Sequence, residues 1–66
     1  MQAKMLEAKM AEYGDNCVKL ADYLGIARQT CALKINGERE FKQSEIDKIA
    51  KRYDLTPHDV VLIFLT

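Results

Sequence analysis

The stretch from Leu20 to Cys31, LADYLGIARQTC, decides the fold of this chain. Its two leucines are four residues apart and lie on one helical face, and the small Ala21 beside them allows a second helix to approach closely. Gly25 can adopt the left-handed conformation that ends a helix, and Ile26 folds back inside after it. A short helix, a tight turn centred on glycine and a second short helix together predict a helix-turn-helix arrangement.

Turn signals divide the whole chain into five short segments, each predicted to be a helix. The turns are Gly14-Asp15-Asn16, Gly25, Asn36-Gly37 and Leu55-Thr56-Pro57. No segment alternates strictly between apolar and polar residues with turn residues on both sides, so we expect no strand. The sequence therefore predicts an all-α fold, a compact bundle of five short helices, with residues 1–66 forming a single domain.

The expected helix ends follow from capping chemistry. Asn16 is a good N-cap for the second helix, and Ser44 is a candidate cap for the fourth, with Phe41 before it as a staple residue. Thr56 precedes Pro57 at the first position of the fifth helix, where the missing N–H of proline costs nothing. The residues whose spacing predicts a core-facing side are Ala3, Leu6, Met10, Tyr13, Cys17, Leu20, Ala21, Leu24, Cys31, Ile35, Ile46, Ile49, Ala50 and Tyr53.

Composition excludes several classes of protein. With 48% hydrophobic and 30% charged residues, disorder caused by low hydrophobicity is excluded. Ten basic residues balance ten acidic ones, so binding to nucleic acid or to an anionic membrane needs a local patch. The longest apolar run, Val60 to Leu65, is far shorter than the roughly 20 residues of a membrane helix, so no membrane partner is expected. Two cysteines without a signal peptide indicate a cytoplasmic protein.

The sequence contains no recognisable catalytic or metal-binding pattern. His58 has no acidic or cysteine neighbour at metal-ligand spacing, and Cys17 and Cys31 do not form a C-x-x-C pair. We therefore expect no enzyme activity, metal, cofactor or small-molecule substrate. Cys31 is predicted to be buried, whereas a redox role remains an alternative for Cys17 because a helix N-terminus lowers a thiol pKa.

One family pattern matches nearly the whole chain. It runs Thr-Gln-x-x-Leu-Ala-x-x-Leu-Gly-Ile-Ser-x-x-Thr-Val-Ser, then Asn-Gly, a helix with Ile-Ala at its middle, and a last helix after Ser/Thr-Pro. The matching residues are Leu20, Ala21, Leu24, Gly25, Ile26, Thr30, Asn36, Gly37, Ile49, Ala50, Thr56 and Pro57. The sequence thus resembles the Cro and repressor type of phage helix-turn-helix domain, in the wider Xre-like family. This resemblance implies a lambda repressor-like fold and a phage or prophage transcriptional regulator that represses by occupying a DNA operator, in the nucleoid or an infected host.

Three departures from the pattern bear on function. Asn16 and Cys17 replace the Thr-Gln pair, which keeps the cap but removes the amide donor that touches a DNA phosphate in such proteins. Ala27 replaces the serine before the third helix and loses a capping hydroxyl worth about 1 kcal/mol. Cys31 replaces the central valine or isoleucine as a smaller apolar filler.

The third helix is the predicted DNA-contacting element. If Cys31 and Ile35 face the core, the outward face can contact bases, because Arg pairs with guanine, Gln with adenine and Leu with the thymine methyl. In the alternative interpretation, Arg28 and Gln29 are ordinary solvated residues and Leu33 belongs to the core. The predicted base-contacting residues are Arg28, Gln29, Ala32 and Leu33.

The local charge around this helix favours DNA although the total charge is zero. Residues 27–42 carry four basic side chains against two acidic ones. The loop after a recognition helix lies beside the DNA backbone in this geometry. The predicted phosphate-contacting residues are Asn16, Lys19, Thr30, Lys34, Asn36, Arg39 and Lys42.

The apolar C-terminal segment suggests self-association. On a helix that starts near Pro57, one face covers the core with Val60, Val61 and Phe64, and a second apolar face stays uncovered. A homodimer would use the uncovered residues, because paired half-sites need paired recognition helices. In the alternative, all six residues complete a small core. The alternative function is a helix-turn-helix-derived protein-interaction module that does not bind DNA and docks through this segment. The predicted dimerisation residues are Leu62, Ile63 and Leu65.

Overall fold

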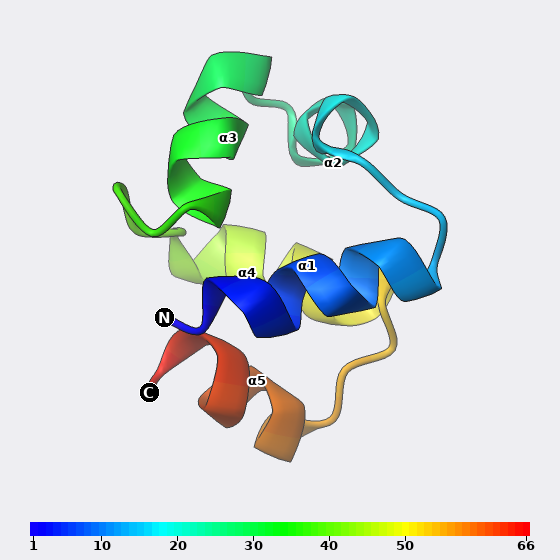
Figure 1. Ribbon diagram of the computed structural model, residues 1–66, viewed down its shortest axis with the longest axis vertical. Helices are drawn as coiled ribbons and strands as arrows, with labels where there is room; N and C mark the ends of the chain where they lie inside the picture. Colours follow the sequence, from blue (N-terminus) through cyan, green and yellow to red (C-terminus); the bar gives the residue numbers. More distant parts are fainter.

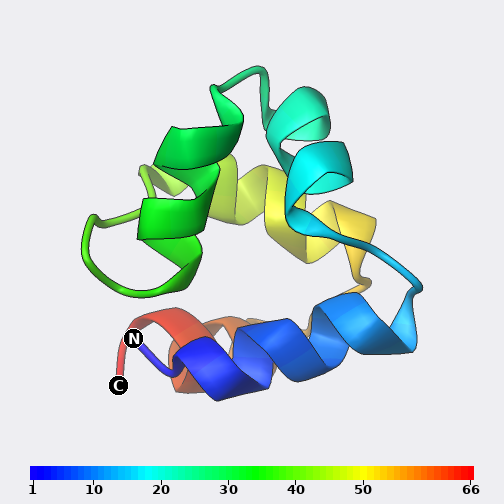
Figure 2. The same ribbon diagram turned by 45° about the horizontal axis from the view of Figure 1, so that its top comes forward.

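The computed structural model covers residues 1–66 and contains five α-helices and no strand. These helices are α1 (Ala3–Glu12), α2 (Cys17–Leu24), α3 (Arg28–Ile35), α4 (Gln43–Arg52) and α5 (Pro57–Phe64). The predicted all-α fold, a compact bundle of five short helices, is thus confirmed. α1 packs beside α5 on one side of the molecule, while α2 and α3 pack together on the other (Figure 1; Figure 2). No helix is long and apolar enough to cross a bilayer.

One hydrophobic core joins all five helices. Most positions predicted from helical spacing are buried, although Ala3, Cys17 and Ala50 are only partly covered and Tyr13 is exposed. The Tyr13 ring nevertheless packs at a tilt against the Tyr53 ring, with ring centroids 5.5 Å apart. The buried apolar residues are Leu6, Met10, Leu20, Ala21, Leu24, Cys31, Ile35, Phe41, Ile46, Ile49, Tyr53 and Ile63.

Most of the predicted helix ends are present. The Asn16 side chain accepts a hydrogen bond of 2.9 Å from the Lys19 N–H, and Gly25 ends α2 in the left-handed conformation with φ 73°. Thr56 and Asp59 cap α5 reciprocally: each side chain accepts a hydrogen bond from the other residue's backbone N–H.

The prediction that Ser44 caps α4 is wrong. The helix begins at Gln43, two residues before the start that a Ser44 cap implies, so Ser44 lies within its first turn. The Lys42 N–H donates to the Glu45 carboxylate at 2.8 Å, and this bond satisfies the chain at the helix start. The Glu45 carboxylate, at the third position of the helix, therefore provides the capping hydrogen bond that was expected from the Ser44 hydroxyl.

The face of α5 that meets the core differs from the prediction. Ile63 is 1% exposed, so it is part of the core and is not available to a partner. Its carbonyl accepts a hydrogen bond of 2.7 Å from the Gln2 N–H, which brings the two termini together (Figure 1). Val60, Ile63 and Phe64 lie on the inner face, as a helical repeat of three and four residues requires, and Val61 points outward.

An ion-pair cluster joins the turn before α2 to the end of α4. Asp15 accepts two hydrogen bonds from the Arg52 guanidinium, at 2.6 and 3.0 Å, and one from the Tyr53 hydroxyl at 2.5 Å. The guanidinium also lies 4.7 Å from the ring centroid of Tyr23 on α2. The cluster therefore fixes α2, which precedes the turn to α3, against α4.

Candidate nucleic-acid interface

The turn between α2 and α3 has the predicted conformation. The Gly25 N–H donates to the Asp22 carbonyl, and the Ile26 N–H donates to the Ala21 carbonyl at 3.0 Å. Ile26 is partly buried against the core. Ala27 precedes α3 and, as its missing hydroxyl implies, makes no side-chain cap. These bonds hold α3 at a fixed angle to α2, at one edge of the molecule (Figure 2).

α3 is oriented as the helical repeat predicts. Cys31 and Ile35 face the core. Arg28 and Gln29 are exposed, Leu33 is 37% exposed, and Ala32 is partly buried between them. The structure thus brings the four predicted base-contacting residues to one outward face, and Leu33 is not absorbed into the core.

Lys34 lies elsewhere than predicted. It is 4% exposed, and its ammonium lies 2.7 Å from the Glu45 carboxylate. Burial alone raises the pKa of Glu45, but the Lys34 ammonium and the Lys42 N–H outweigh it and lower that pKa overall. The Lys34 charge is neutralised inside the protein, so the prediction that Lys34 contacts a phosphate is wrong.

The other predicted phosphate-contacting residues remain accessible to different degrees. Four of them are exposed: Lys19, Asn36, Arg39 and Lys42. The three basic residues among these four form no salt bridge within the chain. Thr30 is partly buried.

Asn16 is exposed, but its side-chain oxygen is engaged by the cap of α2. Its side-chain amide can still donate to a phosphate.

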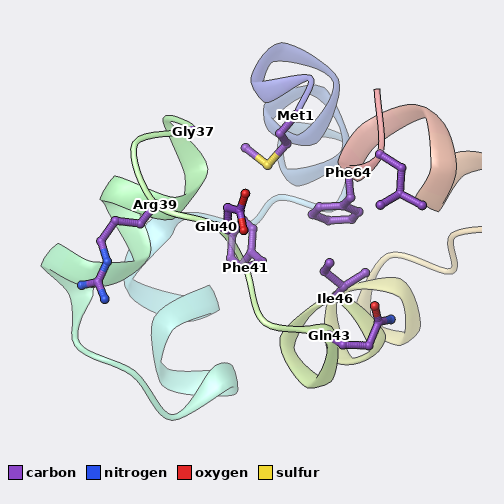
Figure 3. A pocket seen from close by; sticks show the side chains of 9 residues that line it. Met1, Gly37, Arg39, Glu40, Phe41, Gln43, Ile46 and Phe64 are labelled. Carbon is purple, nitrogen blue, oxygen red and sulfur yellow. The ribbon is translucent and has the colours of Figure 1, made fainter.

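The loop from Asn36 to Phe41 is fastened at both ends. At its start, the Leu33 carbonyl accepts hydrogen bonds from the N–H groups of Glu38 and Arg39. At its end, the Phe41 ring packs edge-on against Phe64, with centroids 5.8 Å apart. Figure 3 shows these two rings beside a cavity of about 370 Å³, whereas the Arg39 side chain points away from it. The loop therefore holds Arg39 outward, near α3.

The two cysteines differ in burial. Cys31 is fully buried, and burial, reinforced by the neighbouring Cys17 thiol, raises its pKa to about 12. It is an inert core residue. The partly buried Cys17 donates a long S–H hydrogen bond of 3.5 Å to the Arg28 carbonyl.

No cluster of three or more His, Cys, Asp or Glu side chains forms a metal site. Comparisons with protein-family models, with curated proteins and with solved structures find no match for this chain.

Proposed function

We propose that this protein is a sequence-specific DNA-binding transcriptional regulator of the Cro or repressor type, which inserts α3 into the major groove of an operator. The observation that carries the proposal is the outward face of α3. Arg28, Gln29 and Leu33 are exposed side by side while Cys31 and Ile35 anchor the helix from behind. Their chemistry matches guanine, adenine and the thymine methyl group. Occupation of the operator would exclude polymerase and repress transcription.

The distribution of free charge supports binding to a DNA backbone. Seven of the ten basic side chains form no salt bridge, and four of these seven belong to the predicted interface: Arg28, Lys19, Arg39 and Lys42. These cations are carried by α2, α3 and the loop that follows α3, the elements that flank the groove in a helix-turn-helix complex. Because the chain is neutral overall and has few such cations, one copy alone should bind DNA weakly.

The function is tested by selecting binding sites from random duplex DNA with the purified chain. We expect an enriched palindromic site, and affinity that falls as salt rises because phosphate contacts release counterions. Lys4→Ala, which removes an exposed charge from α1, is the control and should select the same site. No enrichment together with salt-independent binding would contradict the proposal and favour the protein-interaction module.

We further propose that the protein forms a homodimer through the outer face of α5. With Ile63 in the core, the apolar residues left at this face are Val61, 46% exposed, Leu65, 69% exposed, and the partly buried Leu62. In a two-fold dimer, the two copies of α3 would contact two half-sites of the DNA that lie about 34 Å apart.

The double variant Val61→Asp, Leu65→Asp should sediment as a monomer at micromolar concentration, because two carboxylates would be desolvated in each half of the interface. Val18→Asp changes an equally exposed apolar residue on α2 and should leave the dimer intact. A monomeric wild-type chain, or a double variant that still sediments as a dimer, would exclude this interface.

A further inference from the structure

One carboxylate oxygen joins α3 to the start of α4. The Glu45 Oε1 accepts hydrogen bonds from the Lys34 ammonium at 2.7 Å and from the Lys42 N–H at 2.8 Å. The side chains of Lys34 and Glu45 are 5% and 7% exposed. The two donors lie at opposite ends of the loop that carries Arg39.

A buried ion pair of this kind is a poor means of adding stability. The cost of removing two charges from water often equals their attraction, and apolar side chains of similar volume stabilise as well or better. Its hydrogen bonds, however, are directional and have a narrow range of length, unlike apolar contacts. The pair is therefore better suited to fixing a geometry than to increasing the free energy of unfolding.

We propose that Glu45 is a positioning residue that fixes the base-contacting face of α3 relative to the phosphate-contacting loop. This inference rests on the proposed DNA binding. Lys34 follows Leu33 directly in α3, and the Leu33 carbonyl already binds the N–H groups of Glu38 and Arg39. With Glu45 holding both Lys34 and Lys42, the helix and the loop form one rigid unit. Contacts to phosphates then place α3 at one depth and angle in the groove.

Loss of the Glu45 contacts should reduce discrimination between DNA sequences more than it reduces affinity for DNA. If the unit loosens, Arg39 and Lys42 keep their charge and still contact phosphates, but Arg28 and Gln29 lose their fixed position over the bases. The ratio of affinities for the operator and for a single-base-pair variant should fall roughly 5- to 150-fold, the equivalent of one base contact. The slope of affinity against salt should stay the same.

Two variants test this with the full chain. Lys34→Met, Glu45→Leu replaces the pair by apolar side chains and leaves no buried charge. Glu45→Asp keeps the charge and can still accept from Lys42, as Asp59 accepts from Thr56 at 3.0 Å at the start of α5, but it is one methylene too short to hold Lys34 as well. Both should retain helical circular dichroism and lose discrimination with an unchanged salt slope.

Asp47→Ala removes an exposed carboxylate from the same helix and should keep the wild-type ratio. A folded variant of either kind that discriminates like the wild type would overturn the positioning role. If the double variant does not fold, Glu45→Asp decides alone, since its cap and charge are preserved. A wild-type chain without any discrimination would instead refute the proposed function, so the two failures are distinguishable.

Discussion

Replacing Arg28 with alanine is expected to weaken binding to the preferred operator by roughly 1–3 kcal/mol for each half-site. Arg28 is the first residue of α3 and is exposed without a salt-bridge partner. The N-terminal residues of a recognition helix contact base edges, and a guanidinium can donate two hydrogen bonds to guanine O6 and N7. The loss should therefore be concentrated at one base pair, where the variant no longer distinguishes guanine from the other bases.

Arg39→Ala provides the matched comparison, because it removes the same charge from the neighbouring loop. Its side chain points outward from a loop fastened at Leu33 and Phe41 (Figure 3). A phosphate contact carries no sequence information, so all DNA sequences should be weakened about equally, and the salt slope should fall by about one unit per contact.

The two variants are compared on the selected operator and on versions with each base pair changed in turn, across a salt series. A uniform loss for Arg28→Ala over every sequence would show that this residue contacts the backbone. Base recognition would then have to be sought at Gln29 and Leu33 or outside α3.

The order and extent of the helices could be predicted because their signals are local. Asn16, Gly25 and the Thr56-Pro57 pair act within one turn of the helix they begin or end, so the sequence alone shows them. The orientation of α3 was predictable for the same reason, since Cys31 and Ile35 are one turn apart and both apolar. The prediction for Ser44 was wrong because it left out the next residue, Glu45, whose carboxylate accepts the hydrogen bond at the start of the helix.

The fate of the long charged side chains could not be predicted, because it depends on residues distant in sequence. In the sequence, Lys34 has the pattern of a solvated cation in a basic stretch, but the fold brings Glu45, eleven residues away, against it. The face of α5 was ambiguous because all of its later residues are apolar, and the packing of α1 and α4 against α5 decides that Ile63 is covered. Helical periodicity carries no information where every position is hydrophobic.

The Asp15 cluster is a long-range arrangement of the same kind, and it makes stability depend on pH. Hydrogen bonds from the Arg52 guanidinium, helped by Tyr53 and opposed by burial, lower the pKa of Asp15 from 3.8 to about 2. The carboxyl is 4% exposed, so solvent screens these interactions little. Since the folded protein binds this proton more weakly than the unfolded chain does, the cluster contributes its full stability only above about pH 4, and loses it as the pH falls toward 2.

We expect Asp15→Asn to lower the free energy of unfolding by about 2 kcal/mol at pH 7, a large share for so small a domain. Urea unfolding of both proteins from pH 7 to pH 2 measures this difference. It should shrink as the pH falls toward 2, because the wild-type carboxyl becomes protonated there and loses its charge-dependent advantage over the amide. Other carboxyls, such as Glu45, titrate in both proteins and cancel from the comparison. A difference that stays constant across this range would mean that Asp15 stabilises through its shape and hydrogen bonds alone, because an interaction that depends on charge must disappear with the charge.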